Sequence, residues 1–234
     1  MQEFSGKVAI VTGAAGNLGK ALCQALANRG ASIALLGHHL DSLEAARSGL
    51  EESAAFAVDL VDDRAVEAAI AAVMTRFGRI DILANVAGGF TMGPPLHETS
   101  DADWDGMMNL NARSVFNSCR AVIPRMLAHG GGRIVNVAAR AALKGQGRMA
   151  PYCASKAVVI RLSESLAEEH RDDGINVNCV LPGTLDTPEN RAAMPDADPE
   201  RWVTTAALAD VIVFLASDAA RAITGASIPV YGRG

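Results

Sequence analysis

Tyr152 and Lys156 are the two side chains whose types and spacing best suit catalysis. Residues four apart on a helix lie on one face, about one turn from each other. A phenol, with an ordinary pKa of about 10, is a poor base at neutral pH, but a nearby ammonium stabilises the phenolate and lowers that pKa. The pair is therefore predicted to exchange a proton with a carbonyl or alcohol oxygen while a hydride moves to or from the substrate carbon.

A glycine-rich segment with Gly13, Gly16 and Gly19 lies between an apolar run and an Ala-rich helical pattern. At such a strand–turn–helix junction, backbone N–H groups meet a pyrophosphate at the positive end of the helix. Gly13 is expected to allow the tight turn, and Gly19 to let the helix pack closely on the sheet. Gly16 and Asn17 are expected to supply positive φ values. The segment, including Leu18, predicts a dinucleotide site.

The end of the second predicted strand bears on the choice of dinucleotide. It contains Gly37, His38 and His39 but neither Asp nor Glu, the residue types that hold a free ribose 2′-hydroxyl. His38 is expected to help bind a 2′-phosphate, so NADP is slightly favoured over NAD. The two adjacent imidazoles should point apart and hold no metal. Asp59 is expected to bind the adenine amino group, with a helix N-cap as the alternative.

The elements that position these residues can be predicted from the sequence. Short apolar runs alternate with helical patterns along the whole chain. This alternation predicts an α/β fold: a doubly wound parallel sheet of the Rossmann type, with about seven strands and helices on both faces. Ligands are expected at the edge where the strands end. The predicted strands are Lys7–Thr12, Ser32–Leu36, Ala54–Val58, Asp81–Ala84, Arg133–Val137, Ile175–Leu181 and Ser227–Val230. The predicted helices are Leu18–Asn28, Asp41–Gly49, Asp62–Arg76, Asp101–Ala128, Ala154–Arg171 and Thr205–Ala216.

No linker or repeat divides the chain, so residues 1–234 are expected to form one domain, with residues 182–199 as an active-site loop. The net charge of −5 gives no electrostatic reason to expect nucleic acid as a partner. No apolar run reaches the roughly 20 residues that span a bilayer, and no secretory signal is visible, so a cytoplasmic location is expected. Cys23, Cys119, Cys153 and Cys179 form no metal-ligand pattern and are interpreted as buried thiols.

Over essentially its whole length the chain resembles the short-chain dehydrogenase/reductase family. The matching segments are Thr12–Gly19, Asp59-Leu60, Asn85-Val86-Ala87-Gly88, Asn111, Tyr152-x-x-x-Lys156 and Pro182-Gly183-Thr184-Leu185-Asp186-Thr187. The resemblance implies that Asn85, Ala87 and Gly88 help to hold the cofactor and the central sheet. It implies that Thr187 reaches the nicotinamide carboxamide and that Asn111 takes part in a proton relay. The matching Leu60, Pro182 and Gly183 are assigned to the cofactor site.

The chain departs from the family at Ala139, thirteen residues before Tyr152, where members usually carry a catalytic Ser. Losing one such donor costs on the order of 10²–10³ in rate. Dihydropteridine reductases share this Ala, the Ala-rich segment after it and a loop similar to residues 184–195. A quinonoid pterin is already electron-poor and needs less carbonyl activation. The other departure is in the glycine turn, where most members place the middle Gly at position 17.

Two hypotheses follow: an NAD(P)(H)-dependent oxidoreductase for a small carbonyl or quinonoid substrate, or a dinucleotide-binding protein with little chemistry of its own. Gln146 or Arg148 is a candidate replacement for the missing donor, although a solvated loop is the favoured interpretation. Trp104 is interpreted as core, and Trp202 as either a substrate cover or a loop anchor. Members of the family are commonly dimers or tetramers packed through two long helices, here Asp101–Ala128 and Ala154–Arg171.

Overall fold

Parallel strands form the centre of the protein, for which the computed structural model describes residues 2–234. Their bounds are β1 (Val8–Thr12), β2 (Ser32–Gly37), β3 (Ser53–Ala57), β4 (Ile82–Asn85), β5 (Gly132–Val137), β6 (Ile175–Pro182) and β9 (Ser227–Val230). They pair in the order β3-β2-β1-β4-β5-β6-β9, and all six pairings are parallel. The predicted doubly wound sheet, with seven strands in the described residues, is confirmed.

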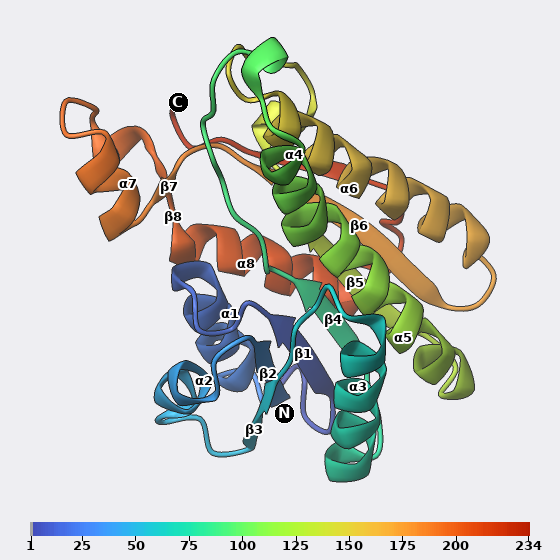
Figure 1. Ribbon diagram of the computed structural model, residues 1–234. Helices are drawn as coiled ribbons and strands as arrows, with labels where there is room; N and C mark the ends of the chain where they lie inside the picture. Colours follow the sequence, from blue (N-terminus) through green and yellow to red (C-terminus); the bar gives the residue numbers. More distant parts are fainter. Residues whose placement is uncertain (1) are drawn as a thin grey trace.

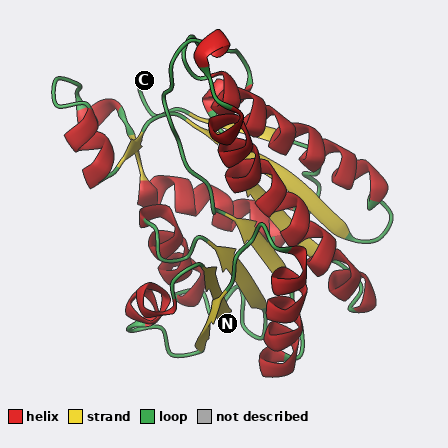
Figure 2. Cartoon of the chain, in the orientation of Figure 1, coloured by secondary structure: helices red, strands yellow, loops and turns green. Residues whose placement is uncertain are grey.

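Helices cover both faces of this sheet, as Figures 1 and 2 show. Their bounds are α1 (Asn17–Ala27), α2 (Leu40–Arg47), α3 (Asp63–Phe77), α4 (Asp101–Met108), α5 (Ser114–Ala128), α6 (Ala150–Glu169), α7 (Pro188–Ala193) and α8 (Thr205–Ala216). One apolar core lies under α1, α2 and α8, and a second lies under α3, α5 and α6. The strands between them are almost continuously apolar because both of their faces are buried.

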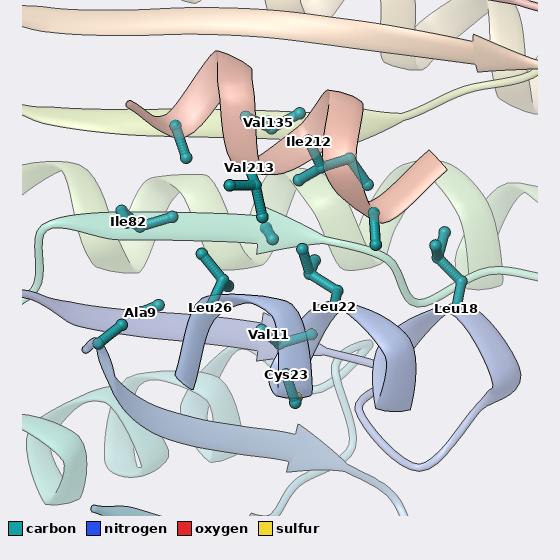
Figure 3. Packing of buried hydrophobic residues seen from close by; sticks show 14 of the residues in the cluster. Ala9, Val11, Leu18, Leu22, Cys23, Leu26, Ile82, Val135, Ile212 and Val213 are labelled. Carbon is teal, nitrogen blue, oxygen red and sulfur yellow. The ribbon is translucent and has the colours of Figure 1, made fainter. Parts of the chain in front are cut away.

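The core between the sheet and helices α1 and α8 is built mainly from aliphatic side chains (Figure 3). Leu22 and Leu26 of α1, one turn apart, are both fully buried and face the strands. Val11 and Ile82 meet them from β1 and β4, and Ile212 closes the layer from α8. Each such side chain contributes about 1.5–3 kcal/mol when it leaves water. This packing fixes where α1 begins, and therefore where the turn before it lies.

The order of the strands reverses between β1 and β4. From β1 the chain moves outward to β2 and β3, and from β4 it moves in the other direction to β5 and β6. The loops that leave β1 and β4 therefore diverge to opposite faces and leave a crevice at the carboxyl edge. The hydroxyl of Thr12 ties the two strand ends together, because it accepts hydrogen bonds from the backbone N–H groups of Val86 and Ala87 at 3.0 and 3.1 Å.

Several element boundaries differ from the predicted ones. The predicted helix Asp101–Ala128 is interrupted by a wider π turn at Asn109–Arg113, in which i→i+5 hydrogen bonds replace those of the α-helix. Helix α6 begins at Ala150 rather than Ala154, because Pro151 suits the first helical turn. Trp104 is 40% exposed on α4, so its assignment to the core was wrong.

The predicted active-site loop of residues 182–199 is partly ordered into secondary structure. It contains α7 and the short strand β7 (Leu185–Asp186), which pairs with β8 (Val203–Thr204). In Figure 1 these elements project from the end of the sheet beside the C-terminus. Thr187 and Pro188 begin α7 with an N-cap and a proline in the first turn.

The four cysteines are buried and free, as expected. The rings of His38 and His39 make an edge-to-face contact with centroids 4.8 Å apart, so the expectation that they diverge was wrong. Within residues 2–234 no three His, Cys, Asp or Glu side chains gather in a way that could hold a metal ion. Over the same residues, no helix combines the length and the apolar character that crossing a bilayer requires.

Candidate active site

A single cavity of about 1400 Å³ follows the carboxyl edge of the sheet from the turn after β1 to the segment after β6. It brings together residues that are far apart in the sequence. The predicted site residues that line it are Gly13, Gly16, Asn17, Leu18, Gly19, His38, Asp59, Leu60, Ala87, Gly88, Tyr152, Lys156, Pro182, Gly183 and Thr187. Asn85 and Asn111 were also predicted but lie outside the lining.

The glycine turn depends on a backbone that a side chain would disturb. Gly13 has φ +65°, and a Cβ added there would lie 2.8 Å from the Cα of Ala87. A Cβ on Gly19 would collide with the carbonyl oxygen of Gly13 and with Ala14. Gly19 therefore lets α1 approach the turn itself, rather than the sheet as predicted.

The prediction of positive φ at Gly16 and Asn17 was wrong. Gly16 is the extended N-cap of α1, with φ −75° and ψ 170°, and Asn17 is the first helical residue. Caps adopt extended angles that any residue tolerates, so the unusual position of the middle glycine strains nothing. Since Gly16 has no side chain to cap the helix, the first backbone N–H groups of α1 are left to a ligand. This uncapped end fits a pyrophosphate.

The end of the cavity beside β2 and β3 is bordered by His38, His39 and Asp59. Both imidazoles are exposed, and they, rather than an acidic residue, directly follow β2. The N-cap of α3 is Asp62, which accepts hydrogen bonds from the N–H groups of Arg64 and Ala65. The N-cap alternative for Asp59 was therefore wrong. Asp59 instead accepts the N–H of Val61 at 2.9 Å.

Asn85 belongs to the sheet and not to the cavity. Its Nδ2 donates to Oδ1 of Asn136 at 2.8 Å and contacts Sγ of Cys119 at 3.4 Å. It is 1% exposed, so a direct cofactor contact is excluded for the described conformation. The amide instead links β4 to β5. Asn136 extends this link, because its Nδ2 donates to Oγ of Ser163 on α6 at 2.8 Å.

Asn111 lies in the π turn, fully buried behind the cavity wall. Its Oδ1 accepts the N–H of Gly89 at 3.0 Å, and its Nδ2 donates to the carbonyl of Gly89 and to Oγ of Ser155, both at 3.1 Å. A Cβ on Gly88 would lie 2.8 Å from Oδ1 of Asn111 and 3.0 Å from Nζ of Lys156. Gly88 therefore lies between the cavity and the side-chain amide of Asn111, close to Nζ of Lys156.

Tyr152 and Lys156 occupy the first two turns of α6. The ring of Phe90 meets that of Tyr152 edge to face, with centroids 5.0 Å apart. Burial raises the pKa of Tyr152 to about 12, and the neighbouring Cys153 adds to the rise. The predicted lowering of this pKa by the lysine is therefore not found. Nζ of Lys156 donates to the carbonyl of Val137 at 2.9 Å, and burial lowers the pKa of Lys156 to about 8.

Ala139 lies in an apolar wall beside Tyr152 and is 6% exposed. Ala141, Met149 and Cys153 complete this wall, so no side-chain hydroxyl in it faces the phenol. The two candidate replacements behave differently. Gln146 lines the cavity and Arg148 does not. Arg148 has φ +64°, and its carbonyl accepts the N–H of Gly93, which fits a turn position.

Residues from the segment after β6 close the other side of the cavity. Thr187 caps α7 by accepting the N–H of Asn190 at 3.2 Å, and both line the cavity. Trp202 lines it as well. Nδ2 of Asn17 donates to Oε2 of Glu189 at 2.8 Å and so connects α7 to the glycine turn.

Sequence reasoning missed Arg140, Arg201 and Tyr231, which also line the cavity. Arg140 was identifiable from its position directly after Ala139. No sequence pattern points to Arg201 or Tyr231, because only the folded chain brings β9 and the segment after α7 to the same wall.

These features define a Rossmann-type protein with a long cleft that reaches from a helix N-terminus to a buried tyrosine–lysine pair. Comparison with known proteins narrows this class. The family model described as short chain dehydrogenase matches residues 7–198. D-threitol dehydrogenase of Mycolicibacterium smegmatis is 40% identical over 243 aligned positions, which cover 98% of this chain and 93% of that protein. 2-(R)-hydroxypropyl-CoM dehydrogenase of Xanthobacter autotrophicus is 36% identical and covers 97% of each chain.

Among solved structures, NAD⁺-bound xylitol dehydrogenase superposes with a TM-score of 0.91 at 30% identity, covering 98% of this chain and 99% of that one. The chain belongs to the short-chain dehydrogenase family. It is an NAD(P)-dependent oxidoreductase, and the oxidoreductase hypothesis is confirmed at that level.

Proposed function

We propose that this enzyme transfers a hydride between nicotinamide and a small carbonyl or quinonoid compound, with Tyr152 as the proton donor. One observation carries the proposal: the glycine turn and the Tyr152–Lys156 pair line the same cavity. The bound nicotinamide supplies the hydride in reduction and takes it up in oxidation. Lys156 is proposed as the electrostatic activator of the phenol and as a ligand of the ribose.

The protonation states of the pair suit reduction. With a pKa of about 12, the phenol of Tyr152 keeps its proton throughout the neutral range and can give it to a carbonyl oxygen. With a pKa of about 8, Lys156 is largely an ammonium at pH 7. Asn111 is proposed as a positioning residue of the proton relay, because its amide holds Gly89 and Ser155 while Ser155 donates to the carbonyl of Tyr152 at 2.9 Å.

NADP is the proposed cofactor in preference to NAD. The cavity wall after β2 carries His38 and His39 and no carboxylate, so it offers imidazoles to a 2′-phosphate and no repulsion. Asp59 is proposed to bind the adenine amino group, and Thr187 the carboxamide. The remaining proposed cofactor contacts come from Gly13, Gly16, Asn17, Leu18, Gly19, Leu60, Ala87, Gly88, Pro182 and Gly183. Fluorescence titration that gives tighter binding of NADH than of NADPH would reverse this preference.

The substrate is proposed to need little help in polarising its carbonyl, because Ala139 leaves the wall beside Tyr152 apolar. A quinonoid dihydropterin meets this condition, which keeps a dihydropteridine-reductase-like activity as the narrower alternative. The relatives named above are dehydrogenases of D-threitol and of a hydroxypropyl compound. Alcohols and their carbonyl products are therefore included among the candidate substrates.

The test is oxidation of NADPH and NADH with a panel of diketones, quinones and quinonoid dihydropterin. Wild-type enzyme should reduce at least one acceptor, and Tyr152→Phe should lower that rate by about 10²–10⁴-fold because the general acid is lost. The phenyl ring keeps the edge-to-face contact with Phe90, so the variant should fold and bind cofactor normally. Equal rates for wild type and Tyr152→Phe on every acceptor would contradict the proposal.

Ala139 also favours a second candidate, a dinucleotide-binding protein with little catalysis of its own. This candidate predicts cofactor binding without turnover of any acceptor in the panel, in either direction. The same titrations and rates therefore separate the two functions.

A single domain, a cytoplasmic location and a dimer or tetramer complete the proposal. The subunits are proposed to pack through the region of α4, α5 and α6, where Trp104 and Phe116 leave apolar surface exposed. Light scattering at several protein concentrations tests the assembly, and a monomer at all of them would contradict it.

A further inference from the structure

Arg140 stands where β5 ends and directly follows Ala139. Arg140 lines the same part of the cavity wall as Ala139, Gln146 and Tyr152. The guanidinium carbon lies 5.0 Å from the centre of the Tyr231 ring. Among residues 2–234 it has no ion-pair partner and donates no side-chain hydrogen bond. The protein thus orients this cation without using its donors.

A guanidinium at this distance from an aromatic ring is held by a cation–π attraction, which uses none of its N–H groups. Those groups form a rigid fork that matches the two oxygens of a carboxylate or phosphate. Other arginines nearby are already engaged. Arg191 of α7 pairs with Asp186 at 2.6 Å, and Nη2 of Arg201 donates to the carbonyl of Arg233 at 2.7 Å. Of the two arginines that line the cavity, Arg140 and Arg201, Arg140 is the one that forms no ion pair and donates no side-chain hydrogen bond among residues 2–234.

The charges around Arg140 also favour an anion. The side-chain carboxylates that line the cavity are those of Asp59, at the adenosine end, and Asp198. Asp198 accepts the N–H of Glu200 at 3.0 Å, so it is occupied as the cap of a short helical turn. Arg201 and Lys156 add two further cations to the same cavity. The substrate end therefore carries more positive than negative groups.

We propose that Arg140 is a specificity-determining residue that binds an oxyanion, a carboxylate or a phosphate, carried by the substrate. The proposal rests on the proposed function and names the substrate class of that same site. The reacting C–O group lies at Tyr152, and the anionic group lies toward Arg140. In reduction the carbonyl carbon takes the hydride and its oxygen takes the Tyr152 proton, while the anionic group remains unchanged. Phe90, Met149 and Met194 add apolar side chains to the lining of the same cavity.

The test compares substrate pairs that share a carbonyl and differ in charge. One arm uses 5-oxohexanoate and its methyl ester, and the other uses dihydroxyacetone phosphate and dihydroxyacetone. Wild type should prefer the charged member of one pair by about ten- to a hundredfold in kcat/KM, chiefly through KM. The arm in which the preference appears identifies carboxylate or phosphate.

Three variants assign that preference to the guanidinium. Arg140→Gln should abolish it and leave the neutral member within about twofold, since only the charge-assisted bond is lost. Arg140→Lys should retain part of it, because the charge remains and the fork is lost. Lys144→Gln is the matched control, because Lys144 is an exposed cation of the same loop outside the cavity and its removal should change nothing.

Equal treatment of charged and neutral members by wild type in both arms would overturn the inference, as would an equal loss on both members in Arg140→Gln. Calorimetric binding to the enzyme–NADP⁺ complex separates this failure from that of the proposed reaction. If neither member is turned over but the charged one binds more tightly, and Arg140→Gln removes the difference, the oxyanion site holds and the proposed reaction fails. Equal binding of both members overturns the site itself.

Discussion

The two ends of the cavity are built from different parts of the chain. The nucleotide end is mainly main chain: the turn at Gly13, the uncapped start of α1 and the loop at Gly88. The substrate end is made of side chains, among them Tyr152, Arg140 and Trp202, which come from separate elements. A site made of main-chain groups depends on the backbone geometry, so it tolerates few substitutions but uses little side-chain chemistry. A side-chain site can change its chemistry by single substitutions, as Ala139 illustrates.

This difference indicates that the substrate specificity of the enzyme depends on the side chains of the substrate end. The nucleotide end requires only that small residues stand at fixed positions, so we expect it to bind the part of the cofactor that all dinucleotides share. The substrate end lacks the hydroxyl usual in the family and instead carries the guanidinium of Arg140, which forms no ion pair within residues 2–234. The following predictions test this division, in order of decreasing effect.

Restoring the hydroxyl should produce the largest change at the substrate end. Ala139→Ser should raise the reduction rate of simple ketones by about 10²–10³-fold, because a donor then polarises the carbonyl. Steady-state kinetics with a neutral diketone measures the effect. Ala141→Ser is the control, since it adds a hydroxyl to the same apolar wall at a position not aligned with the family's Ser. A similar gain in both variants would contradict a specific role of position 139.

At the nucleotide end, adding a single methyl group at Gly13 should weaken cofactor binding. Gly13→Ala places a Cβ 2.8 Å from the Cα of Ala87, at φ +65°. The resulting shift of the turn should weaken cofactor binding by about a hundredfold. Gly6→Ala separates strain from collision, because Gly6 has φ +74° with no atom within 4 Å of the added Cβ. It should cost only about 1–2 kcal/mol of unfolding free energy and leave cofactor affinity unchanged.

The pH dependence of reduction should follow the lysine rather than the tyrosine. The ammonium of Lys156 loses its proton as the pH rises through about 8, whereas the phenol of Tyr152, with a pKa of about 12, stays protonated. The rate constant kcat/KM should therefore fall above pH 8 by up to about tenfold per pH unit. Lys156→Arg keeps a permanent charge and should show no such decline. The same decline in Lys156→Arg would assign it to another group.

Loss of the hydrogen bond between Asn17 and Glu189 should have the smallest effect on cofactor binding. Glu189→Gln weakens the hydrogen bond that Nδ2 of Asn17 donates across the cavity mouth. Cofactor dissociation constants should rise by about two- to fivefold, since an exposed hydrogen bond to a carboxylate contributes little. Glu200→Gln, an exposed glutamate of the same segment, should have no effect. Equal changes in both variants would indicate a general charge effect.

Much of the fold could be predicted because parallel strands buried on both faces require nearly continuous apolar runs, which β1 and β2 display. The π turn at Asn109–Arg113 could not be predicted, because its sequence, NLNAR, contains no Gly or Pro that would mark an interruption of the helix. The backbone of Gly16 and Asn17 was also predicted wrongly. Its angles depend on where α1 begins, and the packing of Leu22 and Leu26 decides that.

By itself, the sequence determined the order of the strands along the chain, the glycine turn, the Tyr152–Lys156 spacing and the absence of a serine at position 139. These are local properties, readable from residue types and short intervals. Only the tertiary structure decided that Asn85 supports the sheet, that the phenol is buried enough to hold its proton, and that Arg140 meets Tyr231. Burial and contact between distant segments depend on how the chain packs in three dimensions, and the spacing of residues within a short segment does not specify this packing.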